Sequence, residues 1–258
     1  MQPVSDDLPD DVYLTKLDDG NLFPSKGLSE LLINYRNGYD WPSGTGPTIS
    51  QATIVSLEND VSHLNQSLNE SSAHEIIVRV SFWAGNNARA HGSIVSACHS
   101  NKKQMLDAIM MLKTPASLRN GIDLLSNLPG VGLVIATKIY RFVCPLLGAA
   151  VDRHASYFFN SLDIHSARQV SDKALSFRRE WAKAGKSTSR LATYTPSGYS
   201  WNRDQYISRY LPLLSSIATS LNMKNITYQC AATGHQLPWR PTDIEMAAYY
   251  WWASNGSR

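Results

Sequence analysis

Five residues, Leu-Pro-Gly-Val-Gly at positions 128–132, separate two stretches whose apolar spacing is typical of amphipathic helices. In the first stretch, Leu118, Ile122 and Leu125 form one helical stripe. The second stretch, residues 133–143, is largely apolar. Glycine accepts a positive φ and leaves no side chain in the way of a close neighbour. The sequence therefore predicts two helices joined by a very short hairpin.

The backbone of this hairpin is a candidate anion site. The N–H groups of Gly130, Val131, Gly132 and Leu133 lie at the start of the second helix, where no preceding carbonyl accepts them. Such a helix N-terminus can bind one phosphate of a nucleic-acid backbone without any sequence preference. An ordinary corner between two helices, which proline and glycine also favour, is the alternative.

Asp152 follows the hairpin glycine Gly132 by 20 residues and directly precedes the stretch Arg-His-Ala-Ser-Tyr-Phe-Phe. This position predicts that Asp152 is the N-cap of a helix that begins at Arg153. A carboxylate stabilised by a helix N-terminus can also act on a sugar C1′, where it stabilises an oxocarbenium-like state and orients a water. An open cleft at Asp152 would favour catalysis, whereas a covered side chain would favour a cap alone.

The hairpin, the spacing and Asp152 together resemble the helix-hairpin-helix–Gly/Pro–Asp superfamily of DNA glycosylases, over about residues 118–162. The resemblance implies a mainly α fold in which two helical domains flank a DNA-binding cleft that holds a flipped-out nucleotide. It implies that Asp152 is the catalytic acid and that the hairpin, residues 128–133, grips the DNA backbone. We expect one domain at residues 73–164, and a second formed by residues 1–72 and 165–258.

One position departs from the pattern of bifunctional members of this superfamily. They carry a lysine two residues after the second hairpin glycine, and its amine attacks C1′. Val134 occupies that position here, so the resemblance implies a monofunctional enzyme in which water attacks. Lys138 lies one turn later on the stripe of Val134 and Arg141, and is either a phosphate-binding residue or a displaced nucleophile. The expected DNA contacts are those of Gly130, Val131, Gly132, Leu133, Lys138, Arg141, Arg153 and His154.

The cysteines separate this chain from the branches that carry an iron–sulfur cluster. Cys98, Cys144 and Cys230 are too few for the four ligands of such a cluster, and their spacing does not suit a metal site. The resemblance is therefore to 8-oxoguanine glycosylases without a cluster, and we expect neither metal nor cofactor. The odd cysteine count indicates a reducing cytoplasm. An acidic N-terminus and the absence of a long apolar run predict no signal peptide and no membrane partner.

Charge is divided unevenly along the chain. Residues 1–72 hold 11 acidic and 3 basic side chains, whereas the remaining 186 residues hold 10 acidic and 21 basic ones. This asymmetry favours a face that binds a polyanion, although a basic surface that only aids solubility is equally compatible. We expect a monomer associated with the bacterial nucleoid, and double-stranded DNA as its partner.

The base that is removed is harder to predict. Flipped bases are held by aromatic stacking and a few hydrogen bonds, which suggests a pocket formed by Trp83, Asn86, Asn87, His91, Trp239 and Asp243. The alternative is that Trp83 is a core residue, as are most aromatic residues of the C-terminal helix. Two substrates remain open: an oxidised purine such as 8-oxoguanine, and a hypermodified phage base such as glucosylated hydroxymethylcytosine, which would make the protein an antiviral defence enzyme.

The expected activity is base release that leaves an abasic site. The alternatives are a bifunctional glycosylase and lyase that uses Lys138, and a non-catalytic module that binds DNA through the hairpin. Outside this region the sequence predicts helices at residues 27–36, 50–68, 101–113, 172–185 and 242–253. The last helix is expected to open with a capping box of Thr242 and Glu245. Residues 74–85 suit a helix or a strand.

Overall fold

The computed structural model describes residues 8–18, 20–39, 51–84, 92, 94–96, 100–166, 169–178 and 200–255. The described chain is mainly helical, as expected, with a few short strands. Its helices are α1 (Lys26–Asn37), α2 (Gln51–Gln66), α3 (Glu70–Trp83), α5 (Lys102–Leu112), α6 (Leu118–Ser126), α7 (Gly132–Val143), α8 (Arg153–Ser161), α9 (Ser200–Gln205), α10 (Leu211–Met223) and α11 (Pro241–Asn255). A 3₁₀ turn, η1 (Pro115–Ser117), precedes α6, and a π-helical segment, η3 (Tyr206–Tyr210), joins α9 to α10.

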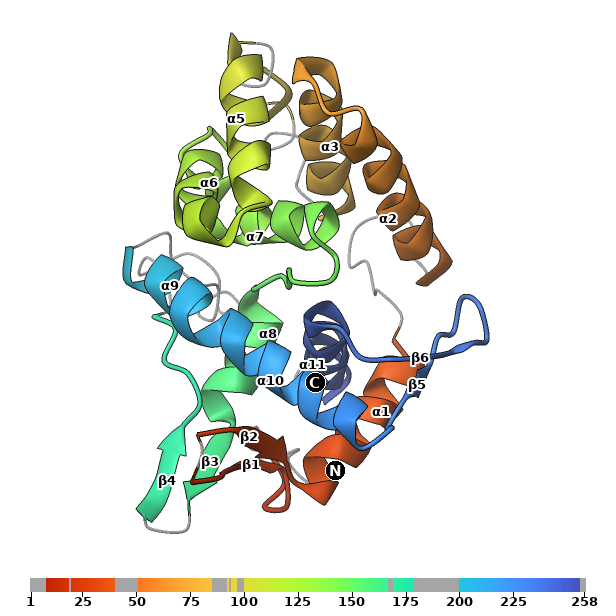
Figure 1. Cartoon of the computed structure of the whole chain (residues 1–258), viewed down its shortest axis with the longest axis vertical. Coiled ribbons are helices and arrows are strands. Elements are labelled where there is room, and N and C mark those ends of the chain that lie inside the picture. The colour runs from red at the N-terminus through yellow and green to blue at the C-terminus, as the bar shows by residue number, and fades with distance from the viewer. Residues whose placement is uncertain are drawn as a thin grey trace, which may run out of the picture.

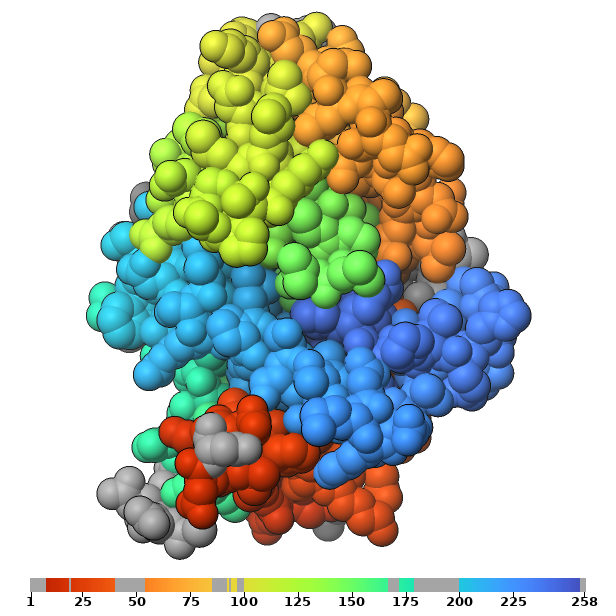
Figure 2. Space-filling view, viewed as in Figure 1, coloured from red at the N-terminus to blue at the C-terminus, as the bar shows by residue number. Residues whose placement is uncertain are grey.

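The helices form two groups that lie one above the other in Figure 1. The upper group contains α2, α3, α5, α6 and α7, which pack against one another. In the lower group, α11 packs against α1, α8 and α10. On the face shown in Figure 2 the two groups touch along their boundary. Helix contacts run across both expected domain boundaries, and the division at residues 73 and 164 stays a prediction.

A small sheet, which the sequence did not indicate, lies at the end of the lower group (Figure 1). Its order is β2-β1-β3-β4, with β1 and β3 parallel and Leu14 beside Ile164. A separate two-stranded hairpin pairs β5 with β6. The strands are β1 (Tyr13–Lys16), β2 (Leu22–Pro24), β3 (Asp163–Ser166), β4 (Gln169–Lys173), β5 (Tyr228–Gln229) and β6 (Gln236–Leu237).

Two expectations about local structure were wrong, and one ambiguity is resolved. The helix expected at residues 172–185 does not form at its start, where β4 pairs with β3 and this pairing overrides the helical spacing. Residues 174–178 are not helical, and residues 179–185 lie outside the described residues. The capping box of Thr242 and Glu245 does not form, since it is the Asp243 side chain that accepts the Arg240 N–H, at 3.0 Å. The ambiguous stretch is helical to Trp83, within α3.

The short connection between α6 and α7 has the geometry that its glycines predict. Gly130 and Gly132 have φ values of +83° and +54°, in the left-handed region that favours glycine. Leu118, Ile122 and Leu125 are all buried, which confirms the apolar stripe of α6. Whether this turn binds DNA stays a prediction.

The segment that leads to Asp152 runs back along α7 and is held closely. A side chain at Gly148 would place its Cβ 2.7 Å from the Tyr140 carbonyl oxygen, so only glycine fits against this helix. The Val151 N–H donates to Thr137 Oγ1 at 3.1 Å, and the hydroxyl of Tyr210 donates to the Ala150 carbonyl at 2.7 Å. These contacts place Asp152 against the middle of α7.

No helix within the described parts of the chain is both long and apolar enough to cross a membrane.

Candidate active site

Asp152 is the N-cap of α8, as expected. Its Oδ1 accepts the N–H groups of His154 at 2.9 Å and Ala155 at 3.0 Å. Both bonds use the same oxygen, so Oδ2 receives no hydrogen bond from the described residues. The side chain is 7% exposed, and a substrate reaches it only if its surroundings open. This covered position is the one expected of a cap alone, and the support for a catalytic role comes from the neighbouring groups.

Lys138 is the first of these neighbours. Its side chain is 4% exposed, and its Nζ lies 5.4 Å from the centre of the Trp83 ring. Burial lowers the pKa of Lys138, although the nearby carboxylates of Asp152 and Glu245 oppose that change. In this conformation the Lys138 ammonium group faces inward, which argues against the expected contact with a DNA phosphate. The displaced lysine lies instead within electrostatic reach of Asp152.

Glu245, on α11, is the second ionisable neighbour of Asp152. It is 3% exposed, and burial raises the pKa of its carboxyl group to about 8, with the Asp152 charge acting in the same direction and Arg141 against it. A carboxyl group with this pKa is mostly protonated at neutral pH. The site thus holds two carboxyl groups in different environments, the usual arrangement for a pair that divides acid and base roles.

Arg141 joins this cluster to α2 and α11. Its guanidinium group donates to Thr242 Oγ1 and to the Met246 sulfur at 3.3 Å, and lies 3.5 Å from Glu58 and 3.8 Å from Glu245. Arg141 is 1% exposed, and this burial argues against its expected contact with a DNA phosphate as well. Its charge stabilises the buried carboxyl groups instead.

His154 and Arg153 begin α8 and behave differently. The His154 ring lies 4.6 Å from Tyr249 and 4.9 Å from Trp252, and burial lowers the pKa of His154 to about 4. A buried, neutral histidine is a poor ligand for phosphate, which argues against the expected DNA contact of His154. Arg153 is exposed and donates to His154 Nε2 at 3.1 Å, which leaves its expected DNA contact a prediction.

The turn between α6 and α7 offers part of the expected anion site. Gly130 and Gly132 are exposed, whereas the side chains of Val131 and Leu133 are buried. The Val131 N–H donates to the Leu128 carbonyl at 3.1 Å and is unavailable to a phosphate, which corrects the expectation for that group. Gly130, Gly132 and Leu133 keep N–H groups for which no acceptor is found among the described residues.

Of the residues expected to form a base pocket, the structure describes three, and Trp83 lies apart from Trp239 and Asp243, which both contact Tyr228. Trp83 is buried beside Phe142, with ring centres 4.9 Å apart, and it faces Lys138 and Arg141. Trp239 packs instead against Tyr228, with ring centres 5.0 Å apart. Asp243 is fully buried and bound to arginines: its Oδ1 accepts from Arg36 Nη2 at 2.8 Å and its Oδ2 from Arg240 Nε at 2.9 Å. The expected pocket residues Asn86, Asn87 and His91 lie outside the described residues.

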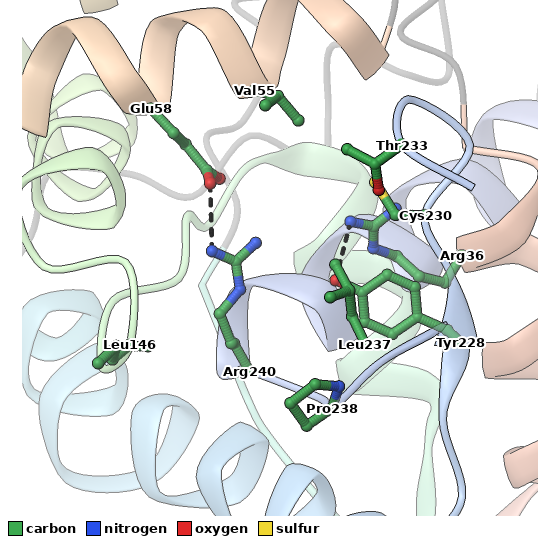
Figure 3. A pocket seen from close by; sticks show the side chains of 10 residues that line it. All are labelled: Arg36, Val55, Glu58, Leu146, Tyr228, Cys230, Thr233, Leu237, Pro238 and Arg240. Carbon is green, nitrogen blue, oxygen red and sulfur yellow. Dashed lines mark hydrogen bonds and ion pairs between the residues drawn. The ribbon is translucent and has the colours of Figure 1, made fainter. Parts of the chain in front are cut away.

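A cavity of about 320 Å³ lies beside these arginines, between α2 and the β5–β6 hairpin (Figure 3). On one wall, Arg240 Nη1 donates to Glu58 Oε2 at 3.1 Å. Neither Asp152 nor Lys138 is among its lining residues, which are Arg36, Val55, Glu58, Leu146, Tyr228, Cys230, Thr233, Leu237, Pro238 and Arg240. This cavity is therefore not where a base would meet Asp152.

Sequence reasoning missed Glu245 and Tyr249 as parts of the site. Both lie on α11, one helical turn apart, and both face the start of α8. The available signal was a single acidic residue inside the otherwise apolar stretch Ile-Glu-Met-Ala-Ala-Tyr-Tyr-Trp-Trp. A buried acid in such a helix is rare unless it is paired or has a function.

The described residues contain no cluster of three His, Cys, Asp or Glu side chains that could hold a metal ion. In comparisons with known proteins, no protein-family model, no curated protein and no solved structure matches this chain.

Proposed function

We propose that the chain is a monofunctional DNA glycosylase that flips out a damaged or modified base and hydrolyses its N-glycosidic bond. The observation that supports this most is the state of Asp152: one carboxylate oxygen is held by the α8 backbone, the other has no partner among the described residues, and ionisable groups surround it. A residue that serves only as a cap needs neither Lys138 nor Glu245 beside it.

In the proposed reaction the Asp152 carboxylate stabilises the positive charge that develops at C1′ and orients the attacking water. The base leaves, and an intact abasic strand remains. The α8 N-terminus stabilises the negative charge throughout. The N–H groups of Gly130 and Gly132 bind the phosphate backbone without reading the bases. The exposed Arg153 adds a further phosphate contact.

Both substrate classes remain candidates: an oxidised purine such as 8-oxoguanine, and a glucosylated hydroxymethylcytosine in phage DNA. The Asn and His residues expected to recognise the base lie outside the described residues, so the pocket does not favour either class. The proposed partner is double-stranded DNA in the cytoplasm, bound by a monomer in a cleft between two helical domains.

A second candidate, a bifunctional glycosylase and lyase, rests on Lys138. A buried amine whose pKa is lowered becomes a nucleophile more easily, and this one lies within electrostatic reach of Asp152. We favour water because Lys138 is displaced by one helical turn, about 5.4 Å, from the position of Val134. A third candidate is DNA binding without catalysis. It does not explain why Asp152, Lys138 and Glu245 lie near one another.

The test is incubation with a panel of duplexes that carry 8-oxoguanine, glucosylated hydroxymethylcytosine and other modified bases. Chromatography detects the released base, and alkali reveals abasic sites as strand breaks. Release from one duplex, with strand cleavage only after alkali, supports the monofunctional enzyme. Cleavage without alkali supports the bifunctional one, and DNA binding without release from any duplex supports the binding module.

A further inference from the structure

The carboxyl group of Glu245 is buried with few partners. The side chain is 3% exposed, and among the residues that the structure describes Arg141 forms an ion pair with its carboxyl group. The distance from Arg141 Nε to this carboxyl group is 3.8 Å, which is long for a hydrogen bond. Buried polar groups normally have hydrogen-bond partners, so a carboxyl group with only a long ionic contact is available to a group that enters the site.

The packing of α11 places this carboxyl group at the site. Glu245, Tyr249 and Trp252 lie on one face of α11 at intervals of four and three residues. The rings of Tyr249 and Trp252 both contact His154, two residues after Asp152. Glu245 is one turn further along the same face.

Charged and titratable groups from several elements face Glu245. Asp152 caps α8, and Lys138 and Arg141 belong to α7. The other groups near Glu245 are Arg36, Tyr39, Tyr206, Tyr210 and Tyr249. The pKa of Tyr39, Tyr206, Tyr210 and Tyr249 is raised by burial, so these phenols stay neutral. Burial and the Asp152 charge keep a proton on Glu245 at neutral pH, despite the three cations.

We propose that Glu245 is the general acid that protonates the departing base, while Asp152 acts at C1′. This inference rests on the proposed glycosylase activity and adds a second catalytic residue to it. A departing base carries negative charge on the nitrogen that held the sugar, and a proton delivered to the base neutralises that charge. General acids of this kind contribute about 10²–10⁴-fold to a rate.

The proposed step balances. The bond between C1′ and the base nitrogen breaks, and its electron pair stays with the base. The Glu245 proton moves to the base, and a water oxygen bonds to C1′ as its proton passes to Asp152. Asp152 then releases that proton to solvent, and Glu245 takes one up. The net reaction consumes one water and yields the free base and an abasic sugar.

The test measures single-turnover base release against pH, with the duplex that the panel identifies. The wild-type rate is expected to fall as pH rises through about 8, since Glu245 must carry its proton. In Glu245→Gln the rate at pH 7 is expected to fall about 10²–10⁴-fold, and this decline with pH should disappear. A Glu245→Gln rate within threefold of wild type, or an unchanged decline, would overturn the proposal.

Glu58→Gln is the matched control, because Glu58 is the other carboxylate beside Arg141, at 3.5 Å. It should keep the decline with pH. Lys138 lies in the same cluster and also loses its proton as pH rises, so Lys138→Gln is measured too. Removal of that cation should move the decline to higher pH, because Lys138 lowers the pKa of Glu245. If the decline vanishes in Lys138→Gln, it belongs to the lysine and the Glu245 proposal fails.

Circular dichroism shows whether Glu245→Gln folds. If Glu245→Gln does not fold, the proposal is tested by the rates of base release against pH for wild type and Lys138→Gln. A wild-type rate that does not decline between pH 7 and 9.5 overturns the proposal. Failure of the glycosylase activity itself looks different: wild type then releases no base from any duplex, or Asp152→Asn releases it at the wild-type rate.

Discussion

The hydroxyl group of Thr137, on α7, accepts the backbone N–H of Val151 at 3.1 Å, one residue before Asp152. The hydroxyl of Tyr206 donates to the Ala149 carbonyl at 2.6 Å. The hydroxyl of Tyr210 donates to the Ala150 carbonyl at 2.7 Å. Three side chains thus hold three consecutive residues that lead to the candidate catalytic acid. We infer that the position of Asp152 is set by α7 and η3 together.

Thr137→Val should therefore destabilise the protein and slow base release. The substitution keeps the shape but leaves the buried Val151 N–H without an acceptor, at a cost of about 1–3 kcal/mol. Urea unfolding measures the stability, and single-turnover kinetics measures the release. Thr137→Ser retains the hydroxyl and is the control. Equal stability and rate in the valine and serine variants would show that this hydrogen bond does not position Asp152.

The sequence was sufficient where local signals decide the structure. The apolar stripe of α6, the glycines of the turn and the cap at Asp152 each follow from a few neighbouring residues, and the structure has all three. The sheet could not be predicted in this way. Its strand β1 has four residues, Tyr-Leu-Thr-Lys, and it exists because it pairs with residues 163–166, far along the chain.

The candidate site also has features that local sequence signals predict and features that depend on distant parts of the chain. The spacing from Val134 singles out Lys138, but its burial depends on Trp83 and on α11. The sequence predicts that Glu245 belongs to a capping box, because Thr242 precedes it by three residues. Its place beside Asp152 depends on the packing of α11 against α8, which local spacing does not reveal.

The protein should lose stability in mild acid through His154. In an unfolded chain histidine titrates near pH 6.5, whereas burial lowers the pKa of His154 to about 4. Protonation between these values favours the unfolded state, so the stabilisation is complete above about pH 6.5 and is lost as pH falls toward 4. The loss is on the order of 3 kcal/mol. Denaturant unfolding at pH 7 and pH 4.5 measures it.

His154→Phe is the comparison, because a phenyl ring can occupy the place between Tyr249 and Trp252 without titrating. The variant should lose less stability than wild type between the two pH values. The same loss in both proteins would assign the acid sensitivity to other groups.

Gly132→Ala should weaken binding to every duplex alike. At a φ of +54° an alanine is strained by about 1–2 kcal/mol, while its Cβ would meet no atom within 4 Å, so the effect comes from the backbone. Gly132→Asn is the control, since asparagine accepts this conformation more readily and should bind better than the alanine variant. Fluorescence anisotropy with modified and unmodified duplexes measures affinity. A loss confined to one base would contradict a phosphate contact.

Lys138→Ala should leave the salt dependence of DNA binding unchanged, because a buried ammonium group releases no counterions from DNA. If Lys138 bound a phosphate, Lys138→Ala would instead make the salt dependence of DNA binding shallower. Borohydride should trap no covalent adduct between wild-type protein and DNA. Efficient trapping that is lost in both Lys138→Ala and Lys138→Arg would make Lys138 the nucleophile and the enzyme bifunctional.

The central claim is that Asp152 is a catalytic acid as well as a helix cap, and single-turnover base release by Asp152→Asn tests it most directly. Asparagine caps a helix about as well as aspartate, so the variant should fold and α8 should remain. With saturating enzyme and the duplex that wild type processes, we expect no base release and DNA binding that is equal or tighter, because a charge that repels phosphates is gone. Base release at the wild-type rate would show that Asp152 only caps α8.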